Sequence, residues 1–316
     1  MNKKRRQVIE GSAVSEVVTV ELGGYPQKIM LDGKSETNPV VICLHGIGTP
    51  IPFSVGCRGM FPDITEKVTL VCWDQLGCGI NNYVIDDSFT IDDFKKMTVD
   101  LVREIKKRFP ENSLYLFGMS WGSILSAITA EAVPELISGV VTYGQVLCNM
   151  TFNDEVFSVL EASAMPESKK EKLKKIKNDR TVENAGIIMS WIRKYTEGYI
   201  CKTGKAAPVG EAVIGLLTSP DYNIRDFMAV AVNGYMKNTS LMRQLTDCDL
   251  RPVLSKISVS YTMLQGETDI VTSTKAIEKF LSETENTNLK LITIPESGHM
   301  PSANALDSVF EFFDSM

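Results

Sequence analysis

A serine flanked by glycines is the feature of this sequence that points most directly to chemistry. The segment Gly118-Met119-Ser120-Trp121-Gly122 follows an apolar run at residues 114–117 and opens a segment with helical character. In the pattern G-x-S-x-G the serine sits on a tight strand-to-helix turn, and the glycines remove side chains that would clash there. Ser120 is therefore a candidate nucleophile for acyl transfer.

A serine hydroxyl is a poor nucleophile at neutral pH and needs a base within hydrogen-bond reach. The sequence has two histidines. His45 follows the apolar run at 40–44, and His299 follows the run at 289–294. Since the ends of parallel strands meet at one edge of a sheet, position alone permits either ring. The chain order serine, acid, histidine favours His299 and leaves His45 to shape its own loop.

The third expected group is a carboxylate that orients the imidazole and stabilises its protonated form. It should follow the strand that precedes the strand of His299. Asp269 lies there, in Gly266-Glu267-Thr268-Asp269, directly after the apolar segment 258–264. Glu267 is the alternative in the same loop. We expect Asp269 to be the orienting acid.

Two backbone N–H groups are also required, because a tetrahedral intermediate carries negative charge on its oxygen. One donor is expected from the residue after the nucleophile, and the other from the loop after an early strand. These residues are Trp121 and, in His45-Gly46-Ile47-Gly48, Ile47. Because the donors are main-chain groups, the side chains at these positions carry no information about the role.

The segments that must position these residues alternate between strand and helix. Two alternating runs, 17–22 and 27–31, flank Gly23-Gly24 and predict an N-terminal hairpin. Further strands are predicted at 39–44, 68–73, 114–117, 136–143, 258–264 and 289–294, and helices at 91–108, 121–132, 273–281 and 306–313. This alternation is typical of an α/β protein with a mostly parallel sheet and helices on both faces.

The alternation stops in the middle of the chain. From about residue 146 to 250 the sequence reads as helical segments, with no convincing strand. The sequence therefore predicts a core domain made of residues 1–145 and 251–316, and an inserted helical cap at 146–250.

Composition and charge exclude several classes of partner. A net charge of −6 leaves no basic stripe for a nucleic-acid backbone. No apolar run approaches the roughly 18 to 20 residues that cross a bilayer, so no membrane partner is expected. The basic start at residues 3–6 is followed by Glu10, Ser12 and Glu16 instead of the apolar stretch of a signal peptide. We expect a cytoplasmic protein with a frayed N-terminus.

The seven cysteines are irregularly spaced and contain no C-x-x-C pair. With only two histidines available, this pattern argues against a zinc site and for a reducing compartment. Cys43 and Cys72 lie inside apolar runs and are predicted to pack in the core. Neither a metal nor another cofactor is expected.

Four segments together resemble a known family. They are His45-Gly46-Ile47-Gly48, Trp73-Asp74-Gln75-Leu76-Gly77-Cys78-Gly79, Gly118-Met119-Ser120-Trp121-Gly122-Ser123 and Ser297-Gly298-His299. In these segments the sequence resembles the prolyl iminopeptidase branch of the α/β-hydrolases. The resemblance implies an α/β-hydrolase fold with about eight strands and a cap over the active site.

The resemblance also implies specific roles and an activity. Ser120, Asp269 and His299 would form the catalytic triad, and Ile47 and Trp121 would supply the oxyanion donors. The implied activity is release of an N-terminal residue, often proline, from short peptides. The family's His-Gly-Gly-Pro-Gly is here altered after Gly46, and the cap glutamates that hold the substrate's α-amine have no alignable counterpart.

Three hypotheses about function follow. The first is an aminopeptidase acting on small peptides or amides, for which the cap carboxylates Glu155, Glu161 and Glu197 are candidate amine ligands. The second is a carboxylesterase or amidase for a small acyl substrate, with a pocket lined by apolar cap residues, among them Phe152, Trp191, Tyr195 and Phe227. The third is a ligand-binding homologue that no longer turns over. The sequence gives no indication of the oligomeric state.

Overall fold

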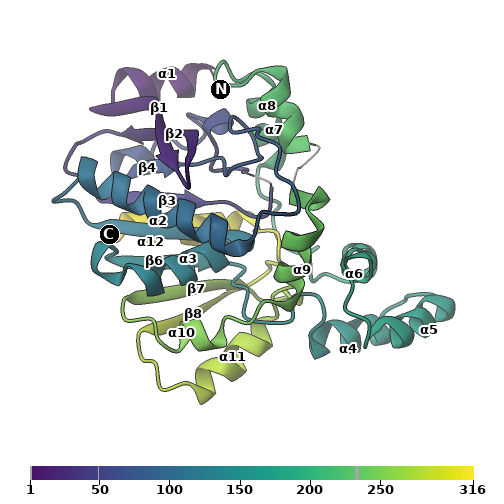
Figure 1. Cartoon of the computed structure of the whole chain (residues 1–316). Coiled ribbons are helices and arrows are strands. Elements are labelled where there is room, and N and C mark those ends of the chain that lie inside the picture. Colours follow the sequence, from purple (N-terminus) through teal and green to yellow (C-terminus); the bar gives the residue numbers. More distant parts are fainter. Residues whose placement is uncertain (1, 49, 232–234) are drawn as a thin grey trace.

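The computed structural model describes residues 2–48, 50–231 and 235–316. Its centre is an eight-stranded sheet in the order β1-β2-β4-β3-β5-β6-β7-β8 (Figure 1). β2 is antiparallel to β1 and to β4, and the other neighbouring strands are parallel. The strands are β1 (Val14–Leu22), β2 (Tyr25–Gly33), β3 (Val40–Leu44), β4 (Thr69–Cys72), β5 (Leu114–Met119), β6 (Gly139–Tyr143), β7 (Ser260–Gly266) and β8 (Leu289–Ile294). The predicted hairpin and the mostly parallel sheet are confirmed.

Helices follow most strands of the sheet. Those of the described residues are α1 (Asn2–Glu10), α2 (Ile91–Arg108), α3 (Trp121–Ala132), α4 (Asp154–Ala162), α5 (Glu167–Ile176), α6 (Val182–Tyr195), α7 (Val209–Leu217), α8 (Ile224–Ala231), α9 (Thr239–Asp247), α10 (Arg251–Leu254), α11 (Thr274–Glu283) and α12 (Ala303–Asp314). Short 3₁₀ turns lie at Val55–Cys57, Ile64–Glu66, Pro134–Leu136 and Tyr235–Lys237. None of the helices described is long and apolar enough to span a membrane.

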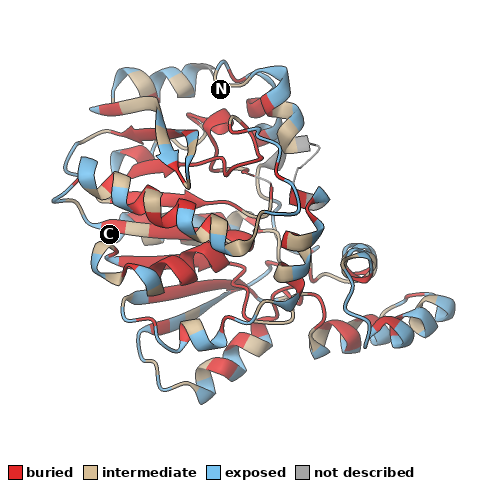
Figure 2. Cartoon of the chain, viewed as in Figure 1, coloured by how far each residue is buried: buried red, intermediate tan, exposed pale blue. Residues whose placement is uncertain are grey.

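Strand β3 shows how the sheet separates two cores. Its residues Val40, Ile42 and Leu44 pack in the larger core, which includes side chains from α2 and α3. Val41 and Cys43 point the other way, into a core that includes side chains from α12. Figure 2 shows the central strands buried between these layers. Cys43 and Cys72 both lie in the second core, as predicted.

Helix α2 begins and ends where the sequence predicts. Thr90 accepts a hydrogen bond from the Asp93 amide, and the Asp93 side chain accepts one from the Thr90 amide. This reciprocal pair satisfies amide groups that the first helical turn leaves unpaired. Three basic residues in the last turn complement the negative end of the helix dipole. Local signals therefore determine both ends of this helix.

The segment between β6 and β7 is helical in its described residues, as predicted. Helices α4, α5 and α6 project to one side of the sheet (Figure 1). They share a core built around Val156, Leu160 and Ile188, which also includes Ile270 and Val271 of the loop after β7. Helix α9 contacts both α6 and α2. Residues 232–234 of the predicted cap lie outside the described residues. The division into a core domain and a cap at 146–250 stays a prediction.

The N-terminus differs from the frayed end that the sequence suggested. Residues Asn2–Glu10 form helix α1, in which the Val8 side chain is buried. The Arg5 guanidinium makes an ion pair with Asp221 at 2.7 Å, between α7 and α8. The prediction failed because it weighed the polar composition of this segment and not a partner that lies 216 residues further along the chain.

Candidate active site

Ser120 sits on the turn between β5 and α3 with an unusual backbone. Its φ is 49° and its ψ is −113°, in the positive-φ region that residues with a side chain rarely occupy. The Ser120 amide donates a hydrogen bond to the Tyr143 carbonyl at the end of β6, over 2.9 Å. This bond ties the strained turn to the neighbouring strand and helps to hold the hydroxyl at the edge of the sheet.

The two glycines around Ser120 are required by close backbone approaches. A Cβ atom at position 122 would lie 1.9 Å from the Leu44 carbonyl oxygen, at the end of β3. A Cβ atom at position 118 would lie 2.3 Å from Ser126 Oγ and 2.5 Å from the Gly122 carbonyl oxygen. Helix α3 can therefore start directly against the sheet only because these positions lack side chains.

His299 lies in the loop between β8 and α12, with its ring against Ser120. Its Nε2 atom is 3.0 Å from Ser120 Oγ. The His299 amide donates to the Gly198 carbonyl over 3.0 Å, so the loop is fastened to the helical segment between β6 and β7. The ring of Tyr199 lies 6.0 Å from the imidazole, centroid to centroid. The His299 side chain is 8% exposed, which leaves it shielded but reachable from one side.

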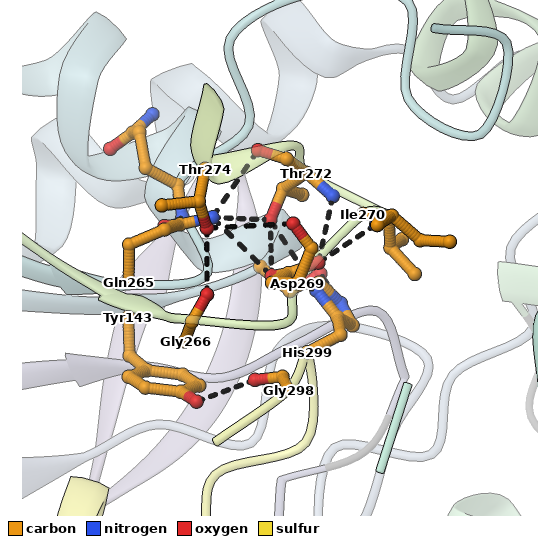
Figure 3. Close-up of polar contacts among 12 residues, drawn as sticks. Tyr143, Gln265, Gly266, Asp269, Ile270, Thr272, Thr274, Gly298 and His299 are labelled. Atoms are coloured by element: carbon orange, nitrogen blue, oxygen red, sulfur yellow. Dashed lines mark hydrogen bonds and ion pairs between the residues drawn. The ribbon is translucent and has the colours of Figure 1, made fainter. Parts of the chain in front are cut away.

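Asp269 follows β7 and contacts His299 (Figure 3), at the ring nitrogen that does not face Ser120. Its Oδ2 atom is 2.9 Å from His299 Nδ1 and accepts a hydrogen bond from Thr272 Oγ1 over 2.7 Å. Its Oδ1 atom accepts hydrogen bonds from the amides of Val271 and Thr272, over 2.8 and 3.1 Å. Gln265 Nε2 adds a further contact at 3.3 Å. The carboxylate is thus fully buried but surrounded by donors.

This set of donors fixes the tautomer of His299. An ionised carboxylate can only accept hydrogen bonds, so the proton between His299 and Asp269 belongs on Nδ1. Nε2 then presents its lone pair to the Ser120 hydroxyl. We assign the neutral ring to the Nδ1–H form from this network.

The two alternatives that the sequence left open lie elsewhere. Glu267 is exposed, and its Oε2 atom accepts a hydrogen bond from the Glu296 amide over 3.2 Å. His45 is buried, with Nδ1 2.6 Å from the Gly46 carbonyl oxygen and Nε2 accepting from the Gln75 amide over 2.9 Å. Burial lowers the pKa of His45 to about 4, so this ring is neutral near pH 7 and shapes its loop.

The segment after β4 braces the turn that carries Ser120. Gln75 Oε1 accepts a hydrogen bond from the Trp121 indole over 2.8 Å. The neighbouring Asp74 is buried and accepts hydrogen bonds from the amides of Val55 and Ile80, and from the Tyr222 hydroxyl. Burial raises the pKa of Asp74 to about 6, while its hydrogen bond from Tyr222 acts to lower it. Asp74 and Gln75, the Asp-Gln pair of the sequence, thus have a structural role: their hydrogen bonds stabilise the segments around them.

The expected oxyanion donors lie on two elements next to Ser120. Trp121 is the first residue of α3, where amide groups have no carbonyl partner within the helix. Ile47 belongs to the loop after β3, and both it and Gly46 line a cavity together with Ser120. A Cβ at Gly46 would lie 3.8 Å from Ser120 Cβ, so this loop runs against the serine.

The cavity beside Ser120 and His299 has a volume of about 440 Å³. Its described lining is mostly apolar and includes five methionines, Met60, Met119, Met150, Met189 and Met300. Arg193 of α6 is the one Lys, Arg, Asp or Glu among the described lining residues. The space is large enough for a small ligand and is shaped chiefly by apolar contacts.

The cap carboxylates proposed from the sequence do not line this cavity. Glu155 pairs with Lys275 at 2.8 Å and accepts a hydrogen bond from Ser273, in the loop after Asp269. Glu161 is exposed on α4, and Glu197 lies 3.9 Å from Lys202. Glu155 therefore stabilises the loop that follows Asp269, and the side chains of Glu161 and Glu197 face solvent.

The aromatic residues proposed to line the pocket also lie elsewhere. Phe152 and Trp191 are buried in the core of α4–α6, Tyr195 packs against that core, and Phe227 packs beside α7. The expectation of a pocket lined by these four residues was wrong, because helical spacing cannot show which face of a cap helix meets the sheet. Other apolar residues, the five methionines among them, line the cavity.

Two contributors to the site were missed in the sequence. Thr272 bonds Asp269 through both its amide and its hydroxyl, and its place three residues after the acid is a turn signal that could have revealed it. Arg193 lies on an ordinary amphipathic helix, and no local pattern distinguishes it from the basic residues around it.

Comparisons with known proteins agree with this architecture. Residues 39–305 match the family model described as alpha/beta hydrolase fold. The chain is 31% identical over 131 residues to "Probable aminopeptidase YbaC" of Bacillus subtilis (strain 168), an alignment that covers 40% of each protein. It is 38% identical over 113 residues to "Proline iminopeptidase" of Neisseria gonorrhoeae, covering 34% of this chain and 33% of that protein. The aligned parts thus span well under half of each relative's length.

Solved structures resemble the chain over nearly its whole length. The crystal structure of VinJ superposes with a TM-score of 0.62 at 20% identity, covering 96% of this chain and 99% of that one. Proline iminopeptidase of Mycobacterium smegmatis gives 0.60 at 17% identity, covering 95% and 96%. At these identities the likeness concerns the fold. Together with the family match over residues 39–305, it shows that this chain belongs to the α/β-hydrolase fold family.

Proposed function

We propose that this protein is a serine hydrolase in which Ser120, His299 and Asp269 act as a catalytic triad. The observation that carries the proposal is the pair of contacts at the imidazole, 3.0 Å from Nε2 to Ser120 Oγ and 2.9 Å from Nδ1 to Asp269 Oδ2. These three side chains follow β5, β8 and β7, and they meet at one edge of the sheet beside a cavity.

The proposed reaction proceeds through an acyl-enzyme. His299 Nε2 takes the proton of the Ser120 hydroxyl as Oγ bonds to the substrate's carbonyl carbon. The same proton then passes to the leaving alcohol or amine as its bond to that carbon breaks. A water molecule, deprotonated by His299, adds to the acyl carbon, and the acid leaves as the proton returns to Ser120. Asp269 stabilises the imidazolium formed in each half.

The amides of Ile47 and Trp121 are the proposed oxyanion donors. Both residues adjoin Ser120, and an amide at the start of a helix also benefits from the positive end of the helix dipole. Each such donor contributes about 3 kcal/mol of transition-state stabilisation in comparable enzymes.

The substrate proposed first is a small peptide or amide. The names of the curated relatives, an aminopeptidase and a proline iminopeptidase, support this choice. The second candidate is an ester or amide of a small acyl group. The cavity favours the second, because its described lining has no carboxylate to hold an α-ammonium group. No Asp or Glu occurs at the positions outside the described residues.

A fluorophosphonate probe tests the proposed mechanism. It should label the wild-type chain rapidly and leave Ser120→Ala unlabelled, since the reagent reacts with activated serines. Ser190→Ala, at an exposed position on α6, serves as the control and should be labelled like the wild type. Equal labelling of Ser120→Ala, or no labelling of the folded wild type, would overturn the proposal. The latter result would support a ligand-binding role.

A substrate panel separates the two candidate substrates. Aminoacyl-naphthylamides with a free or a blocked α-amine are compared with p-nitrophenyl esters of short acids. An aminopeptidase loses activity when the amine is blocked, whereas an esterase or amidase of the second kind does not. Ser120→Ala in parallel shows which of the activities belong to this site.

A further inference from the structure

One cation lies at the wall of a mostly apolar cavity. Arg193, near the end of α6, lines the same cavity as Ser120 and His299. It is an exposed residue, so its guanidinium retains access to water when the cavity is empty. Its charge is the one fixed charge among the described lining residues, and it therefore attracts a negatively charged group of a bound ligand.

The guanidinium is held in place by Tyr199. Its Cζ atom lies 4.3 Å from the centre of the Tyr199 ring, and one of its NH2 nitrogens donates to the Tyr199 hydroxyl over 3.1 Å. Tyr199 in turn lies 6.0 Å from the His299 ring. A stacked arginine keeps its flat fork oriented, with further N–H groups available to a ligand. The Arg193 guanidinium therefore contacts a ring that itself lies near the His299 imidazole.

No carboxylate of the described chain neutralises this cation. Arg193 makes no ion pair within 4.0 Å there, whereas Arg5, Arg58 and Arg251 each pair with an aspartate. The cap glutamates Glu155 and Glu197 form ion pairs with lysines instead. A positively charged group in the substrate would meet a like charge in this cavity, and a negatively charged group would find a fork of donors.

We propose that Arg193 binds a carboxylate at the far end of the substrate's acyl group. The site then takes half-esters or half-amides of short dicarboxylic acids, with the methionine-lined wall against the carbon chain and the scissile carbonyl at Ser120. This inference rests on the serine hydrolase function proposed above. Hydrolysis of such a half-ester adds one water and releases the free dicarboxylate and the alcohol, through the acyl-enzyme already described.

The experiment compares two esters that differ in one group. Mono-p-nitrophenyl glutarate carries the terminal carboxylate, and p-nitrophenyl valerate has the same chain length without it. The wild type should show a higher kcat/KM for the glutarate half-ester, and added salt should reduce this preference because it screens the charge of an exposed cation. The succinate and adipate half-esters then report the best chain length.

Substitutions at position 193 identify the residue responsible. Arg193→Gln should lower the glutarate-to-valerate ratio of kcat/KM about tenfold, the value expected for a hydrogen bond to a charged group. Arg193→Lys should keep part of the preference, since it retains the charge and loses the fork. Arg193→Glu should lower the ratio further. Lys194→Gln is the matched control, because it removes one charge from the neighbouring exposed residue that lines no part of this cavity.

The outcomes separate this inference from the proposed mechanism. If both esters are cleaved in a Ser120-dependent way but the ratio is near one, or is unchanged in Arg193→Gln, the carboxylate site is wrong and the hydrolase function stands. An equal fall of the ratio in Lys194→Gln would also overturn it, because general surface charge would then explain the preference. If a fluorophosphonate fails to label the folded wild type at Ser120, both proposals fail together.

Discussion

His299 Nδ1 lies 2.9 Å from Asp269 Oδ2, although 30 residues separate the two in the chain. The carboxylate has no solvent-exposed surface, and Thr272 and Val271 fill its other acceptor positions. An imidazole bound in this way cannot rotate without leaving the carboxylate short of a donor. The tautomer that presents a lone pair to Ser120 is therefore maintained by the turn that carries Asp269.

Replacing Asp269 with Asn should stop this control of the tautomer. An amide can donate to Nδ1 and so favours the wrong ring form, which in serine proteases costs about 10⁴-fold in kcat. We expect a loss of about that size with p-nitrophenyl esters and an unchanged circular dichroism spectrum. Glu267→Gln is the control, because Glu267 is exposed in the same loop, and it should stay within about twofold of the wild type.

Gly122→Ala should disrupt the start of α3. The added methyl group would lie 1.9 Å from the Leu44 carbonyl oxygen, so the helix or the strand must move. We expect a loss of about 3 kcal/mol or more in the free energy of unfolding, measured with urea. Gly186→Ala in α6 is the matched substitution. Nothing lies within 4 Å of its added methyl group, and it should stabilise the chain by about 0.5–1 kcal/mol. A similar loss in both variants would refute the steric explanation.

His45 should make the fold sensitive to acid. Its pKa is about 4 in the folded chain and near 6.5 when unfolded, so protonation between these values favours the unfolded state. Stability from this residue is complete above pH 6.5 and falls by about 3 kcal/mol as the pH drops to 4. His45→Gln should not show this loss. Urea unfolding of both proteins at pH 7 and pH 4.5 should therefore bring their free energies closer at the lower pH.

Tyr222→Phe should destabilise the fold mainly at pH values where Asp74 is ionised. Burial raises the pKa of Asp74 to about 6, so the folded chain takes up a proton more readily than the unfolded chain. Stability from this group is greatest below its ordinary pKa and falls as the pH rises through about 6. Removing the Tyr222 hydroxyl raises that pKa further, because the hydroxyl donates to the ionised carboxylate.

The measurement for this substitution is urea unfolding at pH 8 and pH 5. We expect Tyr222→Phe to lose about 1–3 kcal/mol at pH 8 and distinctly less at pH 5. Tyr83→Phe provides the control, since its ring is 42% exposed and its hydroxyl donates to the Pro26 carbonyl at the surface. An equal cost of Tyr222→Phe at both pH values would show that Asp74 does not change charge in this range.

The core of the fold could be predicted because its signals are local. The capping residues of α2 and the apolar runs of the parallel strands act within a few residues, and the glycines around Ser120 form a short pattern, although Gly122 is required by a contact with the distant Leu44. Their order along the chain also indicated which histidine and which acid would meet at the serine. The structure places His299 and Asp269 there and gives His45 a hydrogen-bonded place in its loop.

The remaining features depend on contacts between distant segments. Arg5 of helix α1 forms an ion pair with Asp221, and Glu155 forms one with Lys275 instead of lining the cavity. Arg193 reaches the cavity because α6 presents that edge to Tyr199. Helical periodicity identifies the buried face of each of these helices but not the element that packs against that face. The side chains that line the cavity could therefore not be predicted from residue spacing.

The methionines around the cavity have a consequence for how the protein is handled. All five are partly exposed, so dissolved peroxide can reach their thioether sulfurs. Oxidation converts a flexible apolar side chain into a polar sulfoxide. A stored or oxidatively stressed sample should therefore lose turnover of apolar esters before its melting temperature changes, and methionine sulfoxide reductase should restore it.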